Sequence, residues 1–261
     1  MQSIWSGAIS FGLIHIPVKL YTAVTENNLD FTMLRKQDLC PIGYARVCRD
    51  TGEEVPWEDI VKGYEYKKGD YVVLEDEDFK RANVAKTQTI DVIEFVNATE
   101  VDSIYLEKPY YLEPVKEAGK AYVLLREALK KTGKAAVVLF VLRNRQHLAL
   151  MKPEGDLLIL NQMRFASEIR KPDGLTLPAE AEASQKELDM AIRLIDELSE
   201  PFRPEEFHDT YREELERVIE EKTQGRTPEP RGEAPVPTAV PDLMAKLRES
   251  LEAAKRKKKI A

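Results

Sequence analysis

Hydrophobic and polar residues alternate with a period of two along the first part of the chain, which is typical of β-strands with one buried face. Ile9, Phe11 and Leu13 alternate with small or polar residues, and the alternation continues from Ile14 in the opposite phase. Because a shift of one residue exchanges the two faces of a strand, we predict a bulge or sharp bend near Leu13-Ile14, as in the corners of small barrels. Further strand-like runs occupy 71–74, 90–96, 104–106 and 110–112.

The middle of the chain combines one amphipathic helix with a meander of strands. The apolar residues of 121–129 recur at the spacing of one helix face, and Gly133 stands where a helix C-cap is expected. Three apolar runs follow at 135–142, 147–151 and 157–163, and their short polar connections predict two successive hairpins. Residues 1–175 are therefore predicted to form an α+β, mainly β domain, a closed or half-closed barrel with one packed helix.

Two amphipathic helices are predicted in residues 176–225. Ser184 and Glu187 form a capping box that opens the first helix, which carries Leu188 on its apolar face. Pro204 is expected at the start of the second helix, and Gly225 lies beyond its end. Two helices alone cannot bury both apolar faces, so we expect this region to pack on the barrel or on another subunit.

The chain ends in a proline-rich stretch and a basic segment. Residues 226–241 contain five prolines, which predicts an extended, semi-rigid linker. Beyond it, a short helix is expected over 242–252, within the segment 242–261. A helix of about twelve residues is marginal alone in water, so docking of its apolar stripe into a partner's groove is expected; packing on its own domain is the alternative. The stripe comprises Leu243, Met244, Leu247 and Leu251.

The net charge of -7 is distributed unevenly. Residues 104–171 contain 13 Lys and Arg against 7 Asp and Glu, a net charge of +6, and residues 226–261 are also basic. A polyanion responds to charge within about 8–10 Å, so the acidic total does not exclude a nucleic-acid partner. Ordinary solvated faces are the alternative explanation.

Residue combinations for catalysis or metal binding are missing from the sequence. The three histidines, His15, His147 and His208, lie far apart, and Cys40 and Cys48 supply only two of the four ligands that zinc needs unless two copies share a site. The acidic run 75–78 is better explained as the cap of a helix that starts near Phe79. No phosphate-binding loop or nucleophile elbow occurs. We expect no enzyme activity, metal or cofactor, no membrane span, and a cytoplasmic protein.

Several strings occur in order along the chain and identify a family resemblance. They are W-S-G-A-I-S-F-G-L-I-H-I-P-V-K-L-Y at 5–21, D-I-V-K-G-Y-E-Y at 59–66, Y-V-V-L at 71–74, Y-Y-L-E-P at 110–114, A-Y-V-L-L-R-E-A-L at 121–129, F-H-D-T-Y-R-E-E-L at 207–215 and D-L-M-A-K-L-R-E-S-L-E at 242–252. Together they resemble the bacterial Ku proteins of non-homologous end joining, over essentially the whole chain.

This resemblance implies a homodimeric ring around double-stranded DNA ends, with recruitment of DNA ligase D through the C-terminal region. It places a DNA-encircling bridge at about 31–62 and makes 176–225 the arm that contacts the other subunit. It also implies a protein associated with the nucleoid. The bridge would contribute the basic residues Arg35, Lys36, Arg46, Arg49 and Lys62.

A protein that holds any broken end should contact phosphates and sugars rather than bases. Candidate contacts from the basic block are Lys116, Lys120, Arg126, Lys130, Lys131, Lys134, Arg143 and Arg145. Arg143 and Arg145 are favoured because they alternate beside a predicted tight turn. The terminal run of Lys255, Arg256, Lys257, Lys258 and Lys259 is short, so it is expected to add only a few contacts. A protein-interaction adaptor and an enzyme with an unfamiliar site remain the alternatives.

Overall fold

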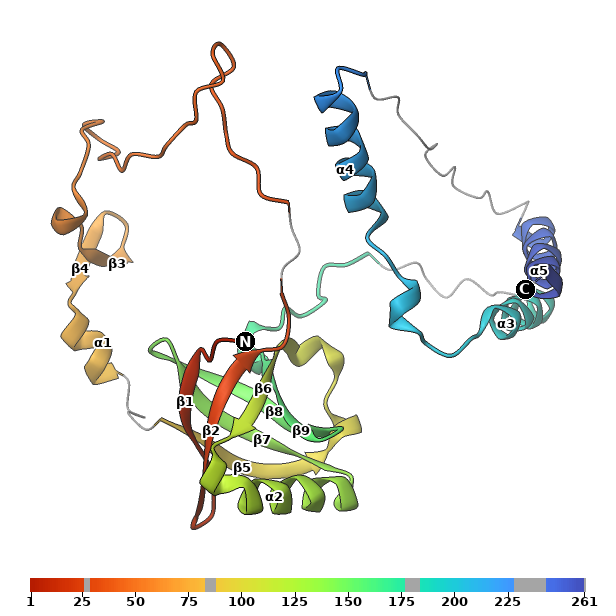
Figure 1. The fold of residues 1–261 in the computed structure, drawn as a ribbon, viewed down its shortest axis with the longest axis horizontal. Helices are drawn as coiled ribbons and strands as arrows, with labels where there is room; N and C mark the ends of the chain where they lie inside the picture. The colour runs from red at the N-terminus through yellow and green to blue at the C-terminus, as the bar shows by residue number, and fades with distance from the viewer. Residues whose placement is uncertain (26–28, 83–87, 177–183, 228–242, 261) are drawn as a thin grey trace. The chain divides into compact units, whose positions relative to one another are not determined.

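The computed structural model describes residues 1–25, 29–82, 88–176, 184–227 and 243–260 (Figure 1). The chain divides into two compact units, Met1–Pro172 and Asp173–Ala261, and each is treated by itself. The first unit contains a closed barrel and a long segment outside it. The second consists of helices and their connections.

The barrel closes in the strand order β1-β2-β6-β9-β8-β7-β5. All neighbouring strands are antiparallel except β1 and β5, which are parallel. The strands are β1 (Trp5–Phe11), β2 (Ile14–Thr22), β5 (Thr89–Asn97), β6 (Leu106–Pro114), β7 (Lys134–Leu142), β8 (Arg145–Glu154) and β9 (Leu157–Met163). The predicted barrel and its α+β, mainly β class are confirmed.

The interior of the barrel is built from the alternation that the sequence shows. Along β2, Ile16, Val18 and Leu20 are buried while their neighbours face outward. Helix α2 (Gly119–Thr132) packs on the barrel and ends at Gly133, whose φ of 65° suits a glycine C-cap. The Tyr122 hydroxyl donates to the Leu112 carbonyl at 2.7 Å and accepts from the Leu158 amide at 2.6 Å. This side chain therefore connects α2 to two strands.

Two strand predictions near turns were wrong. The phase shift after Leu13 marks a complete reversal of the chain, because β1 and β2 form a hairpin with Phe11 opposite Ile14. Gly12, with φ of 60°, permits this two-residue turn. Residues Ser103–Tyr105 form the 3-10 helix η3, not a strand, because the Asp102 carboxylate accepts from the Ile104 amide at 2.9 Å.

The two predicted hairpins between β7 and β9 are confirmed. Arg143 and Asn144 join β7 to β8 with φ values of 52° and 63°, the positive values that a tight hairpin turn requires. Gly155, with φ of 53°, begins the connection from β8 to β9. Other short 3-10 helices are η2 (Ala98–Glu100), η4 (Lys116–Ala118) and η5 (Ala166–Glu168).

The segment 23–88 lies between strands β2 and β5, and we call it the bridge segment. It contains residues 31–62, where the family resemblance predicts the bridge. Its elements are η1 (Trp57–Asp59), β3 (Lys62–Lys67), β4 (Asp70–Leu74) and α1 (Asp76–Ala82). Strands β3 and β4 form a two-stranded sheet of their own, and isolated bridges close two loops at Leu34–Pro41 and Val47–Glu54. Helix α1 begins at Asp76, three residues before the predicted start near Phe79, so most of the acidic run lies in its first turn, where the Glu75 amide donates to Asp78 Oδ2 at 3.0 Å.

In the second unit, helix α3 (Gln185–Leu198) begins at the predicted capping box of Ser184 and Glu187. Helix α4 (Thr210–Thr223) begins later than predicted, because Pro204 opens only the 3-10 helix η6 (Pro204–Glu206). The side chain of Asp209 caps α4 by accepting from the Arg212 amide at 3.1 Å.

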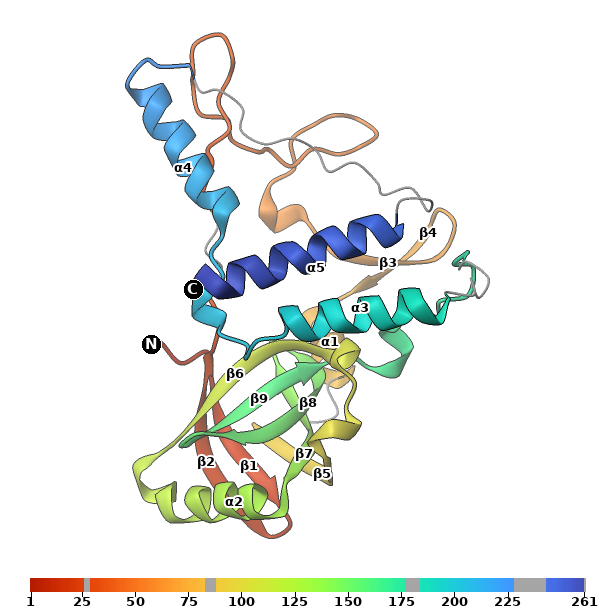
Figure 2. The same cartoon turned by 90° about the vertical axis from the view of Figure 1, so that its right-hand side faces the viewer.

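Helix α5 (Leu243–Ile260) lies beside α3 (Figures 1 and 2). It continues beyond the predicted end at residue 252 because Ala, Lys and Arg are good helix formers, and cations near a helix C-terminus are favourable. The basic run is therefore part of the helix and not an extended tail. Most of the predicted linker lies outside the described residues. Among the described helices, none has the length and apolar character needed to cross a bilayer.

Candidate nucleic-acid interface

The strand directions bring both ends of the bridge segment to one end of the barrel, which we call the bridge rim. The chain leaves the barrel after Thr22 of β2 and returns at Thr89 of β5, and these strands run in opposite directions. Backbone hydrogen bonds attach both ends: the Ala23 amide donates to the Pro109 carbonyl at 3.2 Å, and the Ala8 amide donates to the Gln88 carbonyl at 2.9 Å. The bridge segment is thus a long loop anchored at a single rim.

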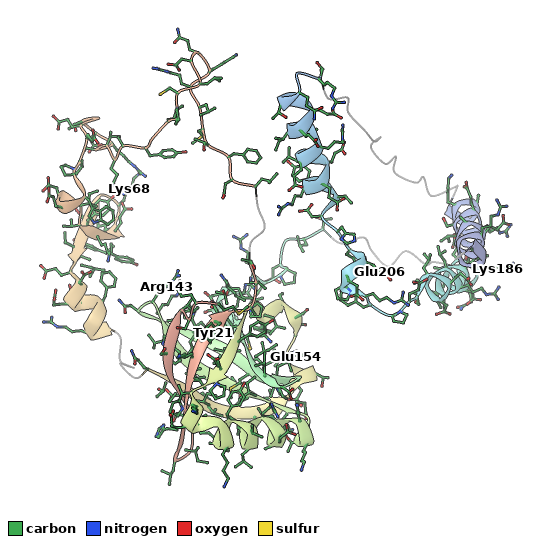
Figure 3. All side chains as sticks on the ribbon, in the orientation of Figure 1. Tyr21, Lys68, Arg143, Glu154, Lys186 and Glu206 are labelled. Atoms are coloured by element: carbon green, nitrogen blue, oxygen red, sulfur yellow. The ribbon has the colours of Figure 1, made fainter. Side chains whose placement is uncertain are left out.

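Arg143 and Arg145 lie at the bridge rim, because β7 ends there and β8 begins there. Figure 3 shows Arg143 at the end of the barrel opposite to α2. Arg143 is exposed in the turn, and Arg145 is 74% exposed with its guanidinium 3.5 Å from Glu168. The two candidates that the sequence favoured are therefore brought together on the rim that carries the bridge segment.

The predicted bridge cations are all exposed, but several have partners within the bridge segment. The Arg35 guanidinium donates to both carboxylate oxygens of Asp38, at 2.9 and 2.5 Å. Arg46 lies 4.5 Å from the centre of the Trp57 ring. Lys62 lies 4.7 Å from the Phe79 ring centre and 3.4 Å from Asp76. Lys36 and Arg49 complete the predicted set.

The sequence reasoning missed two cations in the turn between β3 and β4. Lys67 ends β3, and Lys68 follows it in the turn (Figure 3); both are exposed. A signal was present, because Lys67-Lys68-Gly69-Asp70 separates two strand-like runs. Two strand-like runs joined by a short turn are expected to form a hairpin, so basic side chains in that turn lie at the hairpin tip.

The remaining candidates of the basic block lie at the opposite end of the barrel. Helix α2 follows the end of β6 at Pro114 and precedes the start of β7 at Lys134, and both of these ends are away from the bridge rim. The candidates at this end are Lys116, Lys120, Lys130, Lys131 and Lys134. Charge that is contiguous in sequence is thus divided between two ends of the barrel.

Arg126 has a structural role in the barrel. Its side chain is only 14% exposed, and it donates to the Asp156 carbonyl at 2.7 Å. It also pairs with Glu127 at 2.9 Å, which lowers the pKa of that carboxyl. These partners occupy the guanidinium, so we propose no phosphate contact for Arg126.

Only two residues of the predicted partner-binding stripe, Leu247 and Leu251, have described side chains. Leu247 and Leu251 of α5 are half-buried, and α5 packs against α3. This arrangement corresponds to the alternative in which the helix packs on its own domain. Arg256 is exposed. The side chains of Leu243, Met244, Lys255, Lys257, Lys258 and Lys259 lie outside the described residues.

The two cysteines of the bridge segment are free thiols. Hydrogen bonds from the amide and hydroxyl of Thr51 favour the thiolate and lower the pKa of Cys48. Within the described ranges, no group of three or more His, Cys, Asp or Glu side chains is placed to hold a metal ion.

A comparison with known proteins agrees with this architecture. A family model described as the Ku70/Ku80 beta-barrel domain matches residues 10–190. The chain is 46% identical to a non-homologous end joining protein Ku of Opitutus terrae, over 96% of this chain and 91% of the relative. It is 40% identical to a protein of the same name from Coxiella burnetii, over 100% of this chain and 97% of the relative.

The barrel, its long rim-anchored loop and these matches define a Ku-type β-barrel protein, a class of non-enzymatic DNA-end-binding proteins. The chain belongs to the Ku family of non-homologous end joining proteins. This membership confirms the family resemblance and the expectation of a binding protein rather than an enzyme.

Proposed function

We propose that two copies of this chain form a ring that encircles double-stranded DNA at a broken end and recruit DNA ligase D for non-homologous end joining. The observation that carries the proposal is the bridge segment. Among its described residues no side chain is buried, although it contains many large apolar ones. A segment of this length without a core needs external partners, and its two ends at one rim make it suitable for enclosing a ligand.

Phosphate contacts are proposed for Arg143 and Arg145 at the bridge rim, together with Lys36, Arg49 and Lys68 of the bridge segment. These side chains are exposed and separated along the chain, as expected for binding a backbone rather than reading a base sequence. Arg35, Arg46 and Lys62 have partners of their own, yet they are exposed and can exchange them for phosphate. A ring would prefer ends because a closed loop can be threaded only from a free terminus.

The apolar surface that one copy leaves exposed supports homodimerisation. In the second unit none of the described side chains is buried, and Ile195 on the apolar face of α3 is 64% exposed. In the bridge segment Trp57 is 71% exposed and Tyr64 is 63% exposed. Exposed apolar surface on this scale marks an interaction site, and a second copy would cover it in both regions.

Ligase recruitment is proposed for α5. Leu247 and Leu251 are only half-buried in a helix that packs against α3, so a ligase could bind the α3–α5 pair or replace α3 as the partner of α5. The Arg and Lys residues in its last turns would add a few phosphate contacts near the end. Binding to chromosomal DNA would place the protein at the nucleoid in the cytoplasm.

The ring is tested by comparing linear duplex with a small covalently closed circle of the same sequence. We expect tight binding to the linear form and little to the circle, with the logarithm of affinity falling linearly as the logarithm of salt concentration rises. Equal binding to both forms would exclude encirclement. Failure to bind DNA at physiological salt would favour the alternative function, a protein-interaction adaptor.

Ligase recruitment needs a separate test. Deletion of residues 242–261 should leave retention of linear DNA largely intact and abolish stimulation of DNA ligase D. Full ligase stimulation by the truncated protein would show that α5 is not the recruiting element.

A further inference from the structure

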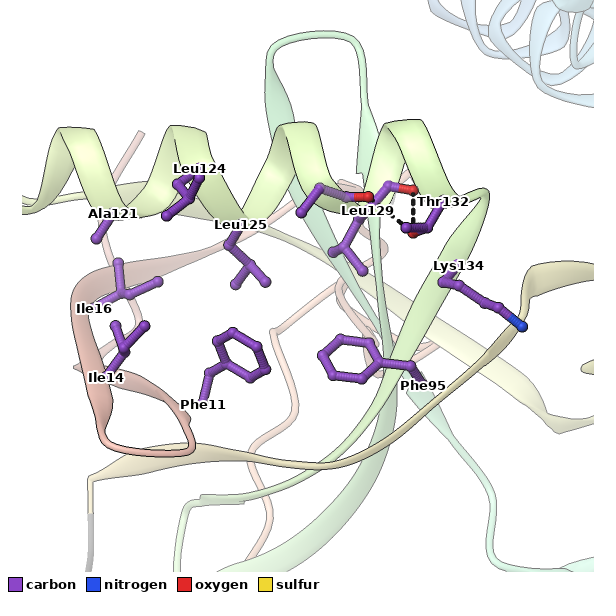
Figure 4. Close-up of a pocket in the computed structure, with 11 residues that line it drawn as sticks. Phe11, Ile14, Ile16, Phe95, Ala121, Leu124, Leu125, Leu129, Thr132 and Lys134 are labelled. Carbon is purple, nitrogen blue, oxygen red and sulfur yellow. Dashed lines mark hydrogen bonds between the residues drawn. The ribbon is translucent and has the colours of Figure 1, made fainter.

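A groove lies at the end of the barrel opposite to the bridge rim. It encloses about 350 Å³, and helix α2 forms one wall (Figure 4). The β1–β2 hairpin and Phe95 of β5 form the other wall. Its lining residues include Phe11, Ile14, Phe95, Leu124, Ala128 and Lys134. Its volume is at the lower end of the roughly 300–1,000 Å³ of ligand pockets, which is enough for a few side chains.

The lining has almost no polar group that could orient a polar metabolite. The Thr132 hydroxyl donates to the carbonyls of Ala128 at 2.8 Å and Leu129 at 3.3 Å, so it is satisfied within α2. Lys134 contributes the remaining polar group, at one end of the groove (Figure 4). Apolar side chains therefore fit this groove better than a sugar or a nucleotide.

The groove is open to solvent, and large apolar side chains line its mouth. Leu124 is 65% exposed, and Ile14 and Phe95 are 42% and 40% exposed. Leu13, beside Ile14 at the tip of the hairpin, is 98% exposed. An apolar cavity with an apolar mouth is typical of a protein interaction site rather than of a packing defect in a core.

Positive charge borders the groove along α2. Lys120 precedes Leu124 by four residues and Lys131 follows it by seven, so both lysines lie in the same row of the helix surface as Leu124. Lys134 adds a third cation at the end of the groove. Two carboxylates are near this row: Glu117 in η4, before the helix begins, and Glu127 in α2, which already pairs with Arg126 and Lys130. The excess of lysines favours an acidic partner.

We propose that this groove docks an acidic segment of a partner protein, which inserts two or more bulky apolar side chains between α2 and the β1–β2 hairpin. The neighbouring carboxylates of that segment would pair with Lys120 and Lys131. The proposal does not depend on DNA binding, because the groove and the bridge rim are at opposite ends of the barrel.

The test uses random 12-residue peptides displayed on phage and selected on the full-length protein. Selected peptides are then synthesised with fluorescein, and their affinities are measured by fluorescence anisotropy. Ala128→Phe fills the groove from an exposed helix position, and Leu124→Ser removes an exposed lining side chain in case the first variant folds poorly. Val123→Phe is the matched control, since Val123 is 43% exposed on α2 but does not line the groove.

We expect selected peptides to be rich in Asp and Glu around a pair of Leu, Phe, Met or Trp residues. Ala128→Phe and Leu124→Ser should each weaken their binding by ~10-fold or more, whereas Val123→Phe should not. Lys120→Glu with Lys131→Glu should remove the preference for acidic over charge-reversed peptides.

Three results would overturn the proposal. They are no enrichment of any peptide, enrichment of basic or polar peptides, and equal binding to the Ala128→Phe and Val123→Phe proteins. A second copy of the chain is a different occupant, and sedimentation velocity distinguishes it. If Ala128→Phe reduces self-association, the groove is a dimer contact and the proposed acidic partner is wrong.

Discussion

The barrel and the bridge segment contain similar aromatic and aliphatic residues but bury them to opposite extents. Phe140 inside the barrel is 1% exposed, whereas Trp57 in the bridge segment is 71% exposed. Burial of apolar side chains is the dominant favourable contribution to folding. We therefore expect the barrel to be stable by itself, whereas in the proposed ring the bridge segment would obtain its stability from DNA and a second copy.

The largest effect is expected from removing the bridge segment. A flexible Gly/Ser linker of about a dozen residues can replace 23–88, because β1 alone separates β2 from β5 and two strand spacings are roughly 10 Å. The shortened protein should keep the far-ultraviolet circular dichroism and cooperative unfolding of the barrel and lose retention on linear duplex DNA. Retention of DNA ends at physiological salt would show that the barrel binds DNA without encirclement.

Two matched aromatic truncations compare the regions directly. Phe140→Ala should lower the free energy of unfolding of the barrel by about 3–5 kcal/mol, since it removes a fully buried ring. Trp57→Ala should lower it by less than about 1 kcal/mol, because the ring is exposed and its contact is with Arg46. Urea denaturation at low protein concentration measures both. A comparable decrease in the free energy of unfolding in the two variants would show that the bridge segment contributes to the folded core.

The sequence predicts those parts of the fold that depend on local patterns. The hairpin at Arg143-Asn144 and the capped start of α3 depend on local patterns, so they were predictable. The turn at Gly12-Leu13 was misread because Leu13 continues the apolar alternation, although its side chain is 98% exposed. The start of α4 was misplaced because proline and aspartate both signal helix starts, and Asp209 provides the cap.

The candidate site was less predictable because basic residues close in sequence are not close in the fold. Arg143 and Lys130 belong to one basic block, yet strand direction places them at opposite ends of the barrel. Arg126 looked like an exposed cation but is held by Asp156. Charge counted along the sequence cannot separate these cases, since the closing order of the strands determines which end each residue occupies.

Tyr122 connects α2 to the barrel, and its hydroxyl makes two buried hydrogen bonds. Tyr122→Phe should lower the free energy of unfolding by about 1–3 kcal/mol, because the Leu112 carbonyl and the Leu158 amide lose a partner. The measurement is urea denaturation, with Tyr21→Phe as the control at a hydroxyl that bonds the exposed Glu113. An equal decrease in the free energy of unfolding in the two variants would mean that burial does not determine how much these hydroxyls contribute to stability.

The two ends of the barrel are compared by a pair of double substitutions. Arg143→Ala with Arg145→Ala should weaken binding to linear duplex by ~10-fold and reduce the magnitude of the salt dependence by about two phosphate contacts. Lys120→Ala with Lys131→Ala removes the same charge from the α2 end and should leave both quantities nearly unchanged. A larger effect from the α2 pair would place DNA at the wrong end of the barrel for the proposed ring.

The smallest effect concerns His147, which is half-buried on β8 with its ring centre 5.5 Å from that of Phe140. Burial disfavours the charged imidazolium and lowers the pKa of His147 below its usual value of about 6.5, and the nearby Arg145 acts in the same direction. The unfolded chain therefore binds more protons than the native protein as the pH falls through about 6.5. Stability should be fully present above that pH and decrease below it, as the pH falls toward the lowered native pKa.

His147→Gln should reduce the difference in melting temperature between pH 7.5 and pH 5.5, and His15→Gln, at an exposed position on β2, is the matched control. Because Arg145 faces the bridge rim, the DNA-bound protein provides a further contrast. Phosphate near Arg145 would offset its repulsion of the imidazolium and raise the pKa of His147, which makes the acid destabilisation smaller with DNA than without it. Identical pH dependence with and without linear duplex would indicate that no phosphate approaches this end of the barrel.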